Sequence, residues 1–189
     1  EMDRPRVGLV IPALNEAASI AAVVSNASAY GVPIVTDDGS TDKTGEVAMA
    51  AGATVVRHDV NRGYDQALNS GFARAHEMGC QFVVTMDADG QHDSTLVASF
   101  LTALEQGADV VVGVRDRRQR IAEHVFAWVA SRKWGINDPL CGMKGYRMRV
   151  YEELGHFDSY NSIGTELAIY AAKKGMKIGQ VPVETRDRV

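Results

Sequence analysis

The chain has 189 residues, of which 46% are hydrophobic and 23% are charged, and its formal net charge is −4. This size and balance fit one globular domain, and the negative charge argues against a nucleic-acid partner. No run approaches the ~18 consecutive apolar residues of a membrane-spanning helix. The two cysteines, Cys80 and Cys141, lack metal-ligand spacing, so we expect a reduced, cytoplasmic protein.

Apolar runs alternate with helical patterns over the first 115 residues. The runs predict buried strands at 7–11, 33–36, 53–57, 82–86 and 109–114. The patterns between them predict helices at about 16–29, 42–51, 63–77 and 94–106, with Asn15 as N-cap of the first. Because strands and helices alternate, we predict an α/β fold with one doubly wound, mostly parallel sheet and crossover helices on both faces.

The pattern changes from residue 116 onward. Residues 117–134 predict a basic amphipathic helix, which suits a membrane surface, packing on the body of the domain, or a contact in a homo-oligomer. Residues 143–148 predict an edge strand. After a polar loop at 157–162, Thr165 is the expected cap of a helix that runs to about Lys174, and 177–183 predict a last strand.

Two aspartates, Asp87 and Asp89, follow the fourth predicted strand. Carboxylates this close raise each other's pKa unless a cation neutralises them, and oxygen ligands suit Mg²⁺ or Mn²⁺. In open α/β sheets, ligands bind at the carboxyl ends of the strands, where this turn is expected. The alternative is a solvated Asp-Gly turn that binds no metal.

A second acidic turn follows the second predicted strand. Asp37 and Asp38 come directly after the strand, and residues 40–42 open a helix. A strand, an acidic turn and a helix N-terminus together suit a nucleoside and its phosphates. Residues 40–42 fit capping, whereas Asp37 and Asp38 precede any cap position and favour a ligand role. The chain lacks the GxGxxG motif of dinucleotide-binding sites and the GxxxxGK[ST] motif of P-loops, so the sequence supports neither kind of site.

Several segments in chain order resemble one known family. They are VGLVIPALNE, VTDDGSTD, TMDADGQH, VVGVR, DPLCGMKGYR and GTELAIYAAKKG. The chain resembles family 2 glycosyltransferases of the GT-A fold, in the dolichyl-phosphate mannosyltransferase and bacterial polyprenyl-phosphate or envelope-glycan branch. The resemblance implies a single Rossmann-like domain with a mixed sheet over residues 7–183, its nucleotide-binding half at 7–115 and its acceptor half at 116–183.

The resemblance also implies a UDP- or GDP-sugar donor, transfer with inversion, Mg²⁺ or Mn²⁺ as cofactor, and roles for particular residues. The implied donor-binding positions are Pro12, Leu14, Glu16, Asp37, Asp38 and Asp87. The implied metal ligands are Asp87, Asp89 and Gln91. The implied catalytic positions are Asp89, Arg115, Arg132 and Glu166. The match at Arg132 is looser, because the chain is shorter between Arg115 and Asp138 than its relatives are.

The start of the last predicted helix bears on the acceptor. Many family 2 enzymes carry a Glu-Asp pair there, with the Asp as general base, whereas this chain has Glu166-Leu167. A phosphate oxygen is already ionised and needs no base, so the missing acid favours a polyprenyl phosphate acceptor. One alternative is a sugar hydroxyl on an envelope glycan, with Glu166 or Asp138 as base. Outside this class, a nucleotidyltransferase and a non-catalytic nucleotide-sugar-binding module remain alternatives.

A lipid acceptor requires access to a membrane. We expect peripheral contact through residues 117–134 at the inner face of the cytoplasmic membrane. Relatives continue beyond the last strand with a basic loop over the site. We therefore expect residues 184–189 to be a truncated tail, and residues 1–6 to be disordered or tag-derived.

Overall fold

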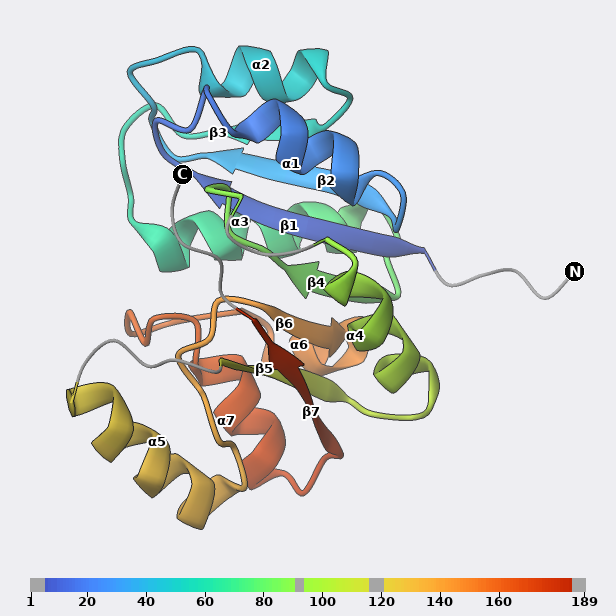
Figure 1. Ribbon diagram of the computed structural model, residues 1–189, viewed down its shortest axis with the longest axis vertical. Helices are drawn as coiled ribbons and strands as arrows, with labels where there is room; N and C mark the ends of the chain where they lie inside the picture. Colours follow the sequence, from blue (N-terminus) through green and yellow to red (C-terminus); the bar gives the residue numbers. More distant parts are fainter. Residues whose placement is uncertain (1–5, 91–93, 116–120, 185–189) are drawn as a thin grey trace, which may run out of the picture.

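The computed structural model describes residues 6–90, 94–115 and 121–184 (Figure 1). These residues form a seven-stranded sheet in the order β3-β2-β1-β4-β6-β5-β7. The strands are β1 (Val7–Ala13), β2 (Val32–Asp37), β3 (Thr54–Arg57), β4 (Phe82–Thr85), β5 (Val110–Arg115), β6 (Lys144–Arg147) and β7 (Ile178–Val183). The helices are α1 (Ile20–Ala27), α2 (Thr44–Ala50), α3 (Tyr64–Glu77), α4 (Leu96–Glu105), α5 (Ile121–Trp134), α6 (Met148–Leu154) and α7 (Glu166–Lys173).

Helices cover both faces of the sheet, as predicted. The apolar residues of β1, β2 and β4 are buried on both sides, because alternate side chains point to opposite faces of a strand. On one face they pack against α1, α2 and α4, and on the other against α3, α6 and α7. Figure 1 shows α1 and α2 beside the β1–β3 half of the sheet, with α7 beside β5. The α/β architecture with a mostly parallel, mixed sheet is therefore confirmed.

The prediction of an edge strand at 143–148 is wrong, because β6 lies inside the sheet. It pairs antiparallel with β4 on one side and with β5 on the other. Tyr146 is fully buried there and meets Phe72 edge to face, with ring centroids 5.5 Å apart. Lys144 of this strand is buried, and its Nζ donates a hydrogen bond to the carbonyl of Cys141 at 2.5 Å.

The assignment of Asn15 as a helix cap is also wrong. Helix α1 begins only at Ile20, after Ser19. Asn15 instead has a left-handed backbone with φ of 55°, and its side-chain oxygen accepts the backbone N–H of Thr41 at 2.9 Å. Asn15 therefore ties the loop after β1 to the loop after β2. The short helix α6 had no sequence prediction; it buries Met148 and Val150.

Helix α5 is the element predicted to contact membrane. Ala127 and Ala130 are buried, which fits packing on the body of the domain, while Arg132 and Lys133 in the last turn are exposed. The basic residues Arg117, Arg118 and Arg120 lie outside the described residues. Across the described ranges, no helix is both long enough and apolar enough to cross a bilayer.

Candidate functional site

The predicted site residues gather at one edge of the sheet. Strands β1, β2 and β4 are parallel neighbours, so their carboxyl ends lie together. Strand β6 is antiparallel to both β4 and β5, so β5 runs parallel to β4 and also ends at this edge (Figure 1). The amino end of β6 lies there as well, which brings residues 138–144 beside the turn after β4.

The turn after β4 carries the predicted metal ligands Asp87 and Asp89, both half-buried. A Cβ placed on Gly142 would lie 2.7 and 2.8 Å from the two carboxylate oxygens of Asp87. Glycine at this position therefore allows the carboxylate to lie against the backbone. Thr85 fixes that backbone, because its Oγ1 donates to the carbonyl of Gly142 at 2.7 Å and accepts the N–H of Lys144 at 3.1 Å.

This turn fits a hard divalent cation. Mg²⁺ commonly takes one or two carboxylates and completes its shell with phosphate oxygens and water. Asp87 and Asp89 would supply the carboxylates. Gln91, the third predicted ligand, lies outside the described residues. Among the residues that are described, no group of three His, Cys, Asp or Glu side chains is arranged to hold a metal. With two carboxylates, the rest of the coordination shell would come from ligand oxygens and water.

Lys144 is a buried cation behind Asp87 that the sequence analysis missed. It is 3% exposed. Burial lowers its pKa, while the neighbouring Cys141, Asp138 and Asp87 act in the opposite direction. The available signal was a lysine inside a predicted strand, where burial of its charge is costly unless opposite charges lie nearby. Burial also raises the pKa of the Cys141 thiol to about 11, which fits an unreactive side chain.

Arg115, predicted to lie near the donor diphosphate, is the last residue of β5 and forms a bidentate ion pair with Asp138. Asp138 is 1% exposed. Its carboxylate accepts Nε of Arg115 at 2.8 Å, Nη2 at 2.9 Å and the backbone N–H at 3.0 Å. This engagement weighs against Asp138 as a general base. Arg132 lies in the last turn of α5, and its role near an acceptor phosphate stays a prediction.

The two carboxylates after β2 are both buried. Asp37 is fully buried and its Oδ1 accepts the N–H of Ser40 at 3.0 Å. Asp38 is 4% exposed and accepts His58 Nδ1 together with the N–H groups of Arg62 and Gly63. The carboxylates therefore organise the turns that follow β2 and β3. Their predicted contact with a nucleoside stays a prediction.

The loop after β1 joins these turns. Pro12 is buried within β1, and Leu14 is 41% exposed. The N–H of Glu16 donates to Oγ1 of Thr44 at 2.9 Å. Ser19 Oγ lies 2.9 Å from Oε2 of Glu16 and 2.8 Å from the carbonyl of Ala88. The first loop, the second turn and the aspartate turn thus form one connected rim.

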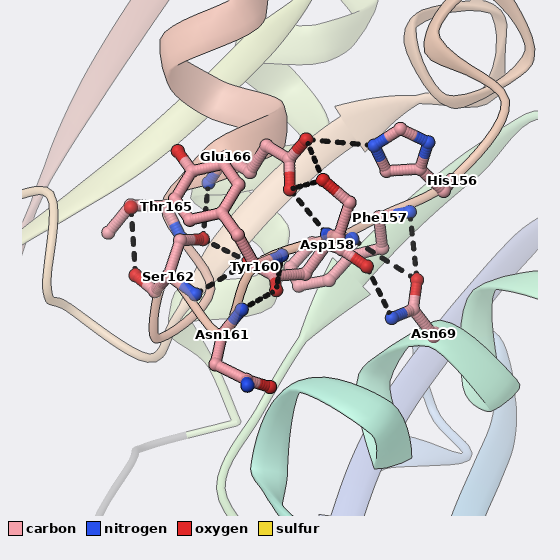
Figure 2. Close-up of polar contacts among 10 residues, drawn as sticks. Asn69, His156, Phe157, Asp158, Tyr160, Asn161, Ser162, Thr165 and Glu166 are labelled. Carbon is pink, nitrogen blue, oxygen red and sulfur yellow. Dashed lines mark hydrogen bonds and ion pairs between the residues drawn. The ribbon is translucent and has the colours of Figure 1, made fainter.

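Glu166, predicted to lie on the acceptor side, begins α7 and is held by the preceding loop (Figure 2). Its Oε1 lies 2.8 Å from Nε2 of His156 and accepts the hydroxyl of Ser159 at 2.9 Å. Its Oε2 accepts the N–H of Ser159. Thr165 is the N-cap residue, as predicted, but its side chain makes no cap bond; Ser162 Oγ accepts the N–H of Glu166 instead, at 2.9 Å.

Two buried carboxylates shape that loop. Asp158 accepts the N–H groups of Tyr160, Asn161 and Ser162, at 3.2, 2.6 and 2.9 Å (Figure 2). Asp65 of α3 accepts the N–H groups of residues 163 and 164, and burial raises its pKa. The polar loop predicted at 157–162 is therefore tightly bonded. Its Asp, Ser and Asn residues were the signal, because these side chains bond nearby backbone N–H groups.

Comparisons with known proteins show which family the sequence matches. The family model described as glycosyl transferase family 2 matches residues 9–155. A dolichyl-phosphate hexose transferase of Haloferax volcanii is 30% identical, over 82% of this chain and 70% of its own. An undecaprenyl-phosphate 4-deoxy-4-formamido-L-arabinose transferase of Edwardsiella ictaluri is 32% identical, over 96% of this chain and 60% of its own.

A solved structure shares the fold. It is glucosyl-3-phosphoglycerate synthase from Mycobacterium tuberculosis in complex with Mn²⁺ and UDP-glucose. The match has a TM-score of 0.78 at 25% identity and covers 98% of this chain and 72% of that one.

Proposed function

Because the chain belongs to glycosyl transferase family 2, we propose that it moves a sugar, with inversion, from a UDP- or GDP-sugar to a polyprenyl phosphate. Asp87 and Asp89 hold the metal and diphosphate of the donor. The rim formed by Pro12, Leu14 and Glu16, with the turn at 37–38, receives the nucleoside. Arg115 lies beside the diphosphate.

One observation carries the choice of acceptor. The start of α7 offers no carboxylate that is disposed to act as a base. Leu167 is fully buried in the core, and both oxygens of Glu166 are engaged by His156 and Ser159. An ionised phosphate acceptor requires no base, whereas a sugar hydroxyl does. The dolichyl-phosphate and undecaprenyl-phosphate named for two relatives support the same choice.

The chemistry follows from these positions. An oxygen of the acceptor phosphate attacks the anomeric carbon, the bond from that carbon to the donor diphosphate breaks, and the nucleoside diphosphate leaves. When bound, the divalent ion neutralises charge that develops on the leaving diphosphate. The guanidinium of Arg115, oriented by Asp138, adds positive charge at the phosphates.

A transfer assay tests the proposal. Labelled UDP- and GDP-sugars are incubated with Mn²⁺ and either a polyprenyl phosphate or a soluble glycan, for the wild type and for Glu166→Gln. We expect lipid-linked sugar and nucleoside diphosphate in equal amounts. Glu166→Gln should lose less than about tenfold in rate, whereas removal of a general base costs about 10²–10⁴-fold. Turnover on the soluble glycan alone, lost in Glu166→Gln, would contradict the lipid acceptor.

Other products identify the alternatives. Pyrophosphate formed from a sugar phosphate and a nucleoside triphosphate would indicate a nucleotidyltransferase. Nucleotide binding without release of nucleoside diphosphate from any donor would indicate a binding module. A lipid acceptor also places the protein at a membrane, and exposed Arg132 and Lys133 of α5 suit anionic lipid. Flotation with anionic vesicles, compared with neutral ones, tests that contact.

A further inference from the structure

We propose that His58 is a positioning residue for the nucleoside site. It orients the carboxylate of Asp38 so that one lone pair of that carboxylate can accept a hydrogen bond from a ring N–H of the nucleotide base. This inference rests on the proposed function, in which Asp38 contacts the nucleoside. Asp38 lies just past β2 and His58 just past β3, and both face the edge of the sheet where the site lies.

The two carboxylate oxygens of Asp38 accept different numbers of hydrogen bonds from the described residues. Oδ1 accepts one from the ring Nδ1 of His58 at 2.6 Å and one from the N–H of Arg62 at 2.9 Å. Oδ2 accepts one from the N–H of Gly63 at 2.9 Å. A carboxylate oxygen accepts two hydrogen bonds, so the bonds that the described residues make leave one position on Oδ2. The side chain of Asp38 is 6% exposed, and a donor from a ligand at this position would complete the hydrogen bonding of Oδ2.

The imidazole of His58 is fixed at both ends. Because a carboxylate only accepts, Nδ1 carries the proton in its bond to Asp38. Nε2 lies 2.8 Å from the hydroxyl of Ser70, which sits on α3. The backbone N–H of His58 donates to the carbonyl of Asp37 at 2.9 Å. The His58 side chain is only 4% exposed, so the ring cannot turn away without leaving buried polar groups unpaired.

A carboxylate held in this orientation distinguishes nucleotide bases by whether they carry a hydrogen-bond donor. Uracil and guanine carry a ring N–H on their pairing edge, whereas cytosine and adenine carry a lone pair there. A carboxylate fixed opposite that edge attracts the first pair and repels the second. A site built to pair with a donor discriminates strongly against a ligand that lacks it. The expected ligand class is therefore UDP or GDP, and the specificity depends on the orientation of Asp38.

Two substitutions separate orientation from packing. In His58→Asn the amide nitrogen stands as many bonds from Cα as Nδ1, so it can bond Asp38. In His58→Gln the amide nitrogen matches Nε2 instead and reaches towards Ser70. Affinities for UDP, GDP, CDP and ADP with Mn²⁺ are measured by calorimetry. We expect His58→Asn to stay within about threefold of the wild type. His58→Gln should weaken the preferred nucleotide about tenfold and leave CDP and ADP unchanged.

The controls keep the outcomes distinct. Thermal melts establish that each variant folds. Ser70→Ala removes only the hydrogen bond between Ser70 and Nε2 of His58. We expect it to lower the preference for UDP or GDP over CDP by about threefold. Equal losses in His58→Asn and His58→Gln, or unchanged selectivity in His58→Gln, would overturn the positioning role. If both His58 variants fail to fold, unchanged selectivity in Ser70→Ala overturns it. A wild type that binds no nucleotide would refute the proposed function itself.

Discussion

Gly142→Ala tests whether the aspartate turn is the metal site. The new Cβ would lie 2.7 and 2.8 Å from the carboxylate oxygens of Asp87 and 3.1 Å from its Cγ. The backbone of Gly142 is outside the left-handed region, so alanine itself is tolerated there. The perturbation therefore acts on the position of one carboxylate and leaves its chemistry unchanged.

The size of the effect follows from the displacement. Ordinary Cβ contacts begin at 3.4 Å, so the nearer oxygen has to move by about 0.7 Å. Thr85 holds the backbone of Gly142, which leaves the side chain of Asp87 as the part that gives way. Mutation of the groups that orient a metal ligand typically lowers metal affinity by about 10–100-fold. We expect Mn²⁺ binding to weaken by that factor, about 1.4–2.7 kcal/mol.

The assay is a titration of Mn²⁺ followed by the electron paramagnetic resonance of the free ion, with UDP or GDP present. Gly179→Ala is the matched control, because its Cβ would meet its nearest neighbours at 3.5 Å, an ordinary contact. We expect the control to bind Mn²⁺ like the wild type, with both variants folded by circular dichroism. Wild-type Mn²⁺ affinity in folded Gly142→Ala would refute Asp87 as a ligand.

Two further predictions concern stability. Asp138→Asn should lower the free energy of unfolding by about 3 kcal/mol in urea titrations, because it breaks the buried pair with Arg115. Glu77→Gln, in an exposed pair, is its control and should cost under about 1 kcal/mol. Burial alone would raise the pKa of Asp109, but the hydrogen bond from Arg149, with others, lowers it below 3.8. The ionised Asp109 therefore stabilises the fold above that pH. Asp109→Asn should have a lower free energy of unfolding than the wild type, and the difference should shrink as the pH falls below 4. A difference that does not change with pH would contradict this.

Much of the fold was predictable because its signals are local. The apolar runs at β1, β2 and β4 and the helical stripe of α3 predicted their elements to within a few residues. Strand β6 was misplaced because its position depends on partners more than fifty residues away, Phe82 to Thr85 of β4. Helix α1 was predicted four residues too early, because Asn15 bonds to the turn at Thr41 rather than to its own helix.

The candidate site divides in the same way. By itself, the sequence determined which turns carry carboxylates, since Asp87 and Asp89 follow a recognisable buried strand. Only the tertiary structure decided what surrounds them. Gly142 against Asp87, Arg115 paired with Asp138, and the Asp38 carboxylate fixed by the ring of His58 all join segments far apart in the chain. Hydrogen-bond partners over such separations are set by strand order and burial, which no local pattern encodes.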